Sequence, residues 1–316
     1  MTTPAATTPA AAAAATTSPL SSVPAKSEAP SSTTATTLPV DRTYPIDRTY
    51  GVTTATRTFV DHTRATSPNG DAPGAPDRTL VTSFWLPDVP GTYPLVVFAH
   101  GYAVTPDFYT PMLERWAAAG YVVAAPTYPI LSGIPGGASH VDYEETFADT
   151  SFVITSVLAL GKDDAVGARV DADRVAVAGH SDGEVIAFGV GFLECCRDPR
   201  VRAVIAMAGN LENANNPHVR DTGTPILHVM ETGDEYDPYP DSIAWDRANL
   251  TTPRWMFTLQ GATHVPPYQV PGNPHFELLA SVVVDFLDGT LKGHPERLDR
   301  IAETVSASQG LASLER

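Results

Sequence analysis

Residues 175–184, VAVAGHSDGE, join a run of small apolar residues to a serine that stands between two glycines. The apolar run predicts a strand covered on both faces, and the residues after it predict a helix. Gly179 and Gly183 flank Ser181 at a distance of two residues, where the absence of a Cβ leaves room for a sharp turn with an exposed hydroxyl. This strand–turn–helix setting makes Ser181 a candidate nucleophile.

From residue 41 onward, predicted strands and helices alternate along the chain. This order is typical of an α/β domain with a mostly parallel sheet and helices on both faces. Strands are expected at 48–60, 78–87, 94–101, 121–129, 173–181, 201–210, 224–233 and 253–264, and helices at 105–120, 141–162, 182–196, 240–249 and 275–291. The first two strands alternate polar and apolar residues, so we expect an antiparallel pair at one sheet edge.

Residues 1–40 consist almost entirely of Ala, Thr, Ser and Pro. Such a segment has too few large side chains to offset the entropy lost on ordering, so a disordered tail or linker is expected there. Residues 41–316 are then the folded domain. A tail of this composition resembles linkers that follow targeting segments, and it favours a secreted or cell-envelope protein.

The chain has 36 acidic and 20 basic side chains, which gives a formal net charge of −16. Nucleic acids and anionic membrane surfaces are poor partners for such a chain, because both require basic patches. No apolar run approaches the roughly 18 residues that a membrane span needs, so none is expected. We expect a monomer that acts on a small molecule.

The sequence offers no cofactor or metal motif. Gly189 and Gly191 lie within a predicted helix and lack the third glycine and the preceding strand of a dinucleotide-binding loop. Cys195 and Cys196 are adjacent, and a bond between neighbours closes a strained eight-membered ring. We therefore expect two free cysteines that serve as small buried hydrophobes near a helix end.

A serine nucleophile requires a histidine to accept its proton and a carboxylate to orient that histidine. In this architecture both partners follow the serine, in the order acid and then histidine. His264 closes a late predicted strand, with a glycine before it and two prolines after it. We prefer it to His275, which is expected to begin the last helix.

The acid is expected after the strand at 224–233, in a loop that contains Asp234, Asp237 and Asp241. Spacing alone barely separates Asp234 from Asp237. Acyl transfer also requires two backbone N–H groups that face the developing oxyanion. The candidates are the amide of Asp182, directly after the serine, and the amide of Tyr102, in the loop after the strand at 94–101.

The segments VVFAHGY, GHSDG, GDEYD and GATH together resemble the α/β-hydrolase superfamily. Within it, the chain is similar over residues 45–290 to bacterial secreted esterases related to cutinase-like polyester hydrolases, dienelactone hydrolases and chlorophyllases. In the polyester-hydrolase branch the acid ends a Gly-x-Glu-x-Asp segment, which residues 233–237 match in register. The resemblance therefore implies an α/β-hydrolase fold and a triad of Ser181, Asp237 and His264.

Two departures from that branch bear on the substrate. The residue after the nucleophile is Asp182 rather than Met, and residues 207–216 contain no Trp that could stack on an aromatic ester. A polar, acidic rim favours small to medium esters over a flat polymer. We therefore expect a cofactor-independent serine carboxylester hydrolase that forms an acyl-enzyme, with a polyester hydrolase and a non-catalytic binding module on the same fold as alternatives.

Overall fold

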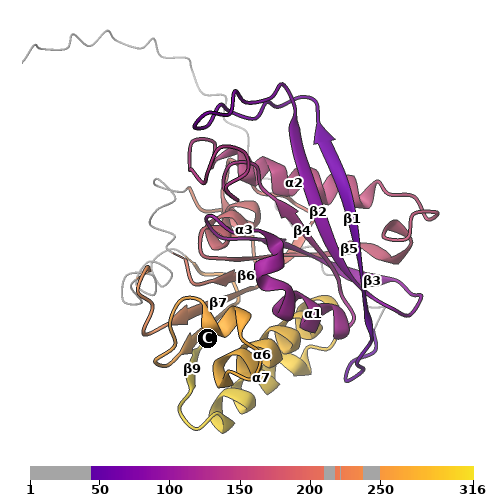
Figure 1. Cartoon of the computed structure of the whole chain (residues 1–316). Helices are drawn as coiled ribbons and strands as arrows, with labels where there is room; N and C mark the ends of the chain where they lie inside the picture. Colours follow the sequence, from indigo (N-terminus) through magenta and orange to yellow (C-terminus); the bar gives the residue numbers. More distant parts are fainter. Residues whose placement is uncertain (1–43, 210–217, 221, 238–249) are drawn as a thin grey trace, which may run out of the picture. The chain divides into compact units, whose positions relative to one another are not determined.

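The computed structural model describes residues 44–209, 218–220, 222–237 and 250–316, and it contains a nine-stranded sheet. Along the sheet the strands follow the order β1-β2-β4-β3-β5-β6-β7-β8-β9 (Figure 1). Their bounds are β1 Val52–Asp61, β2 Arg78–Pro87, β3 Tyr93–Ala99, β4 Val122–Thr127, β5 Val170–His180, β6 Val201–Met207, β7 Ile226–Glu231, β8 Arg254–Leu259 and β9 Ala312–Glu315. Strands β3 to β8 are parallel, whereas β1, β2 and β9 run antiparallel to their neighbours.

Helices cover both faces of this sheet (Figure 1). They are α1 Thr110–Ala118, α2 Glu145–Leu158, α3 Asp182–Phe192, α5 Pro266–Gln269, α6 Pro274–Leu291 and α7 Glu296–Ala307, with short 3-10 turns at Pro106–Tyr109 and Gly167–Arg169. Along β3, Val96 and Phe98 pack with α1, α6 and α7, whereas Leu95 and Val97 pack with α2 and α3. All four side chains are fully buried, which explains why the central strands are apolar without alternation.

The predicted fold class is confirmed, including the antiparallel pair β1 and β2 at one edge of the sheet. The sequence prediction missed α7 and the short strand β9, which pairs antiparallel with β8 at the opposite edge. The tail expected at 1–40 and the helix expected at 240–249 lie outside the described residues.

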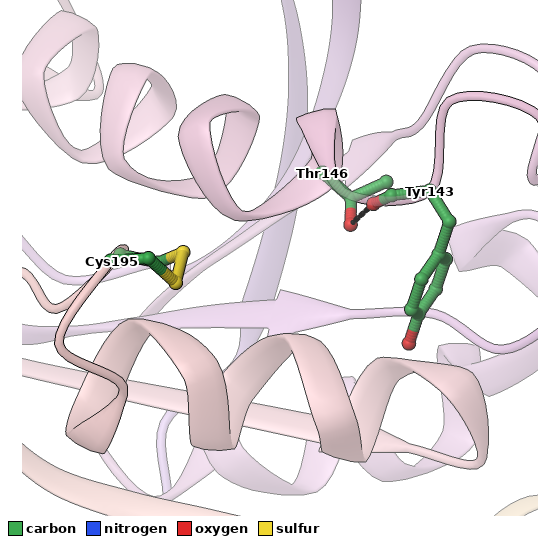
Figure 2. The surroundings of a disulfide bond; sticks show 4 residues. Tyr143, Thr146 and Cys195 are labelled. Atoms are coloured by element: carbon green, nitrogen blue, oxygen red, sulfur yellow. Dashed lines mark hydrogen bonds between the residues drawn. A yellow bond between two sulfur atoms is a disulfide. The ribbon is translucent and has the colours of Figure 1, made fainter. Parts of the chain in front are cut away.

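The two neighbouring cysteines are joined to each other by a disulfide bond in the turn after α3 (Figure 2). Cys195 is exposed and Cys196 is partly buried. The expectation of two free, buried thiols is therefore wrong. The amide groups of Cys196 and Arg197 both donate to the carbonyl of Leu193, and this tight turn carries the pair out of the core.

Candidate active site

Ser181 lies in a sharp turn between β5 and α3. Its backbone has φ 60° and ψ −128°, a conformation that L-residues rarely adopt, and it occupies the N-cap position of α3. A Cβ atom at position 179 would lie 1.8 Å from the carbonyl oxygen of Gly183, and one at position 183 would lie 2.1 Å from that of Ala99. Only glycine therefore fits at both positions. The turn places the serine where the parallel strands end.

The two expected oxyanion residues lie in segments that meet at Ser181. Asp182 is the first residue of α3, where the backbone N–H groups have no partner within the helix. Tyr102 follows Gly101, and a Cβ at position 101 would lie only 3.0 Å from the Cβ of Ser181. The loop after β3 and the start of α3 thus meet at the candidate nucleophile.

His264 lies in the loop after β8 and is hydrogen-bonded to an aspartate. Its Nδ1 is 2.8 Å from Oδ2 of Asp234, and the two side chains are 7% and 1% exposed. Burial alone would raise the pKa of Asp234, but hydrogen bonds from His264 and from the amides of Asp237 and Tyr236 outweigh it and lower the pKa. Asp234 is therefore ionised at neutral pH. A carboxylate at Nδ1 fixes the proton on that nitrogen and leaves Nε2 as an acceptor.

Asp237 does not occupy the position expected of it. Its backbone amide donates to Oδ1 of Asp234 at 3.0 Å, so it forms part of the turn that orients Asp234. Burial and the neighbouring carboxylates of Glu184 and Asp234 raise the pKa of Asp237 to about 6. The structure thus contradicts the expectation that Asp237 contacts the imidazole. Both acids follow β7, but the turn directs only the first of them toward His264.

A chain of buried hydrogen bonds links the loop after β3 to the loop after β8. The amide of Gly101 is 3.2 Å from the hydroxyl oxygen of Tyr109, which is 2.9 Å from Nδ1 of His180. Nε2 of His180 is 2.9 Å from the carbonyl oxygen of His264. Burial, and then the neighbouring His264, lower the pKa of His180 to about 3, so the ring is neutral and carries one proton.

The direction of every bond in this chain follows from that single proton. A carbonyl oxygen only accepts, so Nε2 of His180 donates and Nδ1 must accept. The Tyr109 hydroxyl therefore donates to Nδ1, and its oxygen accepts from Gly101. His180 joins the loop that carries Gly101 and Tyr102 to the loop that carries His264.

We expect Tyr109→Phe to weaken both loops, because it leaves a buried N–H and a buried imidazole nitrogen without a partner. The free energy of unfolding should fall by about 1–3 kcal/mol, and kcat for a soluble ester by about 10- to 100-fold, since a small misplacement of reacting groups is costly. Chemical denaturation and steady-state kinetics measure the two effects. Tyr93→Phe is the matched control: it removes a hydroxyl that donates to Val89 O at the opposite end of β3. A kcat as high as that of the control would contradict this prediction.

A second set of buried polar side chains, centred on Glu184 and Glu231, lies near the hydrogen-bond chain through His180, and no sequence motif predicted it. Glu184 accepts a hydrogen bond from the Gly209 amide at 2.5 Å and lies 3.0 Å from Nε2 of His228. Glu231 accepts from the hydroxyl of Tyr268, whose ring centroid is 4.1 Å from that of His180. Burial raises the pKa of Glu231 well above its usual range. Polar residues within the apolar strand ILHVME were the one available signal.

The described residues lack two further kinds of feature. No group of three or more His, Cys, Asp or Glu side chains there could hold a metal ion. None of the helices in that part of the chain is long and apolar enough to cross a membrane.

Comparisons with known proteins agree with this architecture. A family model described as chlorophyllase matches residues 50–214. Chlorophyllase-1 of Arabidopsis thaliana is 34% identical over 126 residues, which are 38% of this chain and 34% of that protein, so the chain spans about a third of the length of this relative. A solved ferulic acid esterase from Streptomyces cinnamoneus superposes with a TM-score of 0.64 at 22% identity, over 86% of this chain and 98% of that one. The structural match supports the α/β-hydrolase fold.

Proposed function

This chain belongs to the chlorophyllase family of carboxylic ester hydrolases with the α/β-hydrolase fold, and we propose that it cleaves small to medium esters with Ser181 as the nucleophile. His264 is the general base and Asp234 holds its tautomer. The observation that carries the proposal is the bond between buried Asp234 and Nδ1 of His264, which leaves Nε2 as a proton acceptor. The His264 ring centroid lies 4.7 Å from that of His180, the residue that precedes Ser181 in the strained turn.

The reaction proceeds in two balanced halves. The Ser181 oxygen attacks the ester carbonyl as its proton passes to Nε2 of His264. The amides of Tyr102 and Asp182 donate to the oxyanion of the tetrahedral intermediate. The intermediate collapses, the protonated His264 gives its proton to the departing alkoxide, and an acyl-enzyme remains. Water then attacks the acyl group by the same route, which releases the acid and restores the serine.

A fluorophosphonate probe tests the proposal against the alternative of a non-catalytic binding module. We expect a covalent adduct on the peptide that contains Ser181, together with turnover of a p-nitrophenyl ester. The absence of both the adduct and turnover would exclude the proposed hydrolase activity and favour the non-catalytic binding module. Release of soluble aromatic acid from a polyester film would instead support the polyester alternative. The names of the two relatives add chlorophyll and esters of ferulic acid to the substrate panel.

The charge of the site predicts a preference among soluble esters. The described residues that follow the parallel strands, at 100–109, 128–144, 181–184, 208–209, 232–237 and 260–268, include no Lys or Arg. They include Asp182, Glu184, Asp234, Glu235 and Asp237. An anionic substrate is therefore repelled both on approach and on binding.

Three p-nitrophenyl esters of equal acyl length, ending in a methyl, a carboxylate or a trimethylammonium group, measure this preference. We expect kcat/KM for the carboxylate to be at least about 10-fold below that for the methyl ester, and the gap to narrow in high salt. The trimethylammonium ester should not be disfavoured. Equal rates for the anionic and neutral esters at low salt would refute the electrostatic argument without affecting the role of Ser181.

A further inference from the structure

One surface segment, residues 138–143, touches both residues proposed to donate to the oxyanion. The hydroxyl of Tyr102 donates to the carbonyl of Ala138 at 2.8 Å. The ring of Tyr102 is stacked on that of His140, with centroids 4.7 Å apart and planes inclined by 24°. Tyr102 is 43% exposed, so these two contacts, rather than core packing, fix its side chain.

The same segment holds Asp182 through its side chain and its backbone. Nε2 of His140 lies 2.5 Å from Oδ2 of Asp182. The hydroxyl of Tyr143, a residue drawn in Figure 2, donates to the carbonyl oxygen of Asp182 at 2.6 Å. The His140 ring therefore contacts both Tyr102 and Asp182, the two residues proposed to donate to the oxyanion.

The segment and the residue before it, Gly137, are held by side chains of Arg78 and Asn69. Asp142 forms an ion pair with Arg78 at 2.6 Å, and the two side chains are only 4% and 0% exposed. The Asn69 side chain donates to the carbonyl of Gly137 at 2.7 Å. Arg78 is the first residue of β2 and Asn69 lies in the connection before it, so these contacts hold the segment against β2 and that connection.

The hydrogen bond between His140 and Asp182 also has an electrostatic consequence. A carboxylate one residue from the nucleophile opposes the negative charge that develops on the oxyanion. An N–H donated by His140 to that carboxylate partly offsets the opposing charge. The pair is exposed, with side-chain exposures of 55% for His140 and 29% for Asp182, so folding stability alone does not account for it.

We propose that residues 138–143 form a clamp on the oxyanion hole, in which His140 is a positioning residue that orders Tyr102 and Asp182 and offsets the Asp182 charge. The inference rests on the proposed function and extends it. Because the clamp acts on the transition state, its loss lowers kcat and leaves KM nearly unchanged.

His140→Phe is the principal variant, since it keeps a ring that can stack on Tyr102 and removes the nitrogen that faces Asp182. We expect kcat to fall by about 10-fold with KM changed less than about 2-fold. The inhibition constant of a trifluoromethyl ketone, which forms an oxyanion on addition of Ser181, should rise by the same factor as kcat falls. His140→Gln, which retains an N–H donor, should recover part of the loss.

A double-mutant comparison of His140 with Asp182 distinguishes the clamp from a general structural effect of the His140 substitution. In an Asp182→Asn background, where no carboxylate charge has to be offset, we expect His140→Phe to cost less than about 3-fold in kcat. His62→Phe is the matched control, because His62 forms a similar exposed pair with Asp77 at 3.0 Å. Its kcat should stay within about 2-fold of the parent.

The proposal is overturned if His140→Phe has the kcat of the control, if its loss is equal in both backgrounds, or if only KM changes. These outcomes are distinct from a failure of the proposed function. A parent protein that neither reacts with a fluorophosphonate nor cleaves an ester removes the function itself. A parent that does both, with an unaffected His140→Phe variant, removes the clamp alone.

Discussion

Replacing Ser181 by alanine should lower kcat for a p-nitrophenyl ester by about 10⁴- to 10⁶-fold. The hydroxyl supplies the atom that becomes covalently bound to the acyl group, so its removal eliminates the acyl-enzyme. The variant should fold normally, because the strained turn is set by Gly179 and Gly183 and not by the hydroxyl. Steady-state kinetics and mass spectrometry of the fluorophosphonate-treated variant measure the effect.

A matched substitution at a distant serine tests whether loss of a serine hydroxyl by itself lowers activity. Ser306→Ala removes a hydroxyl that donates to Ala302 O on the surface of α7, far along the chain from the site. It should keep full activity and full labelling. Turnover by the Ser181 variant comparable to that of the Ser306 variant would exclude Ser181 as the nucleophile and reassign any ester cleavage to another group.

Replacing Asp234 by asparagine should lower kcat by about 10⁴-fold, the effect expected when a triad acid loses its charge and the imidazole its correct tautomer. Asn at this position can present an N–H to Nδ1, which moves the ring proton to the nitrogen that must accept from Ser181. The same loss of charge at Asp237 is the matched control. It should cost less than about 10-fold, because Asp237 contacts Asp234 through its backbone amide.

Both variants are compared with one soluble ester, by pre-steady-state kinetics that separate acylation from release of the acid. Acylation should be slowed in Asp234→Asn and nearly normal in Asp237→Asn. A larger loss in the Asp237 variant would transfer the orienting role to that residue, and it would mean that the loop after β7 rearranges when substrate binds.

Much of the site is a consequence of local sequence. The apolar run before GHSDG forms a buried strand, and the two glycines permit a turn that any Cβ would block, so Ser181 could be located from residues 175–184 alone. The alternation of strands and helices makes the central strands parallel, so their carboxyl ends lie together at one end of the sheet. His264 is expected in the site for the same reason, since it follows a strand at that end of the sheet. These features depend on neighbours in sequence.

Only the tertiary structure decided which acid contacts His264 and how residues 138–143 contact the site, because these features depend on contacts between residues that are distant in sequence. Spacing left Asp234 and Asp237 nearly equivalent, resemblance to a related branch favoured the wrong one for the contact with His264, and the fold of the turn decided in favour of Asp234. The clamp of residues 138–143 joins Tyr102 to Asp182 across loops that share no motif. A sequence specifies which residue types a loop carries, but the direction in which their side chains point depends on the loops packed beside it.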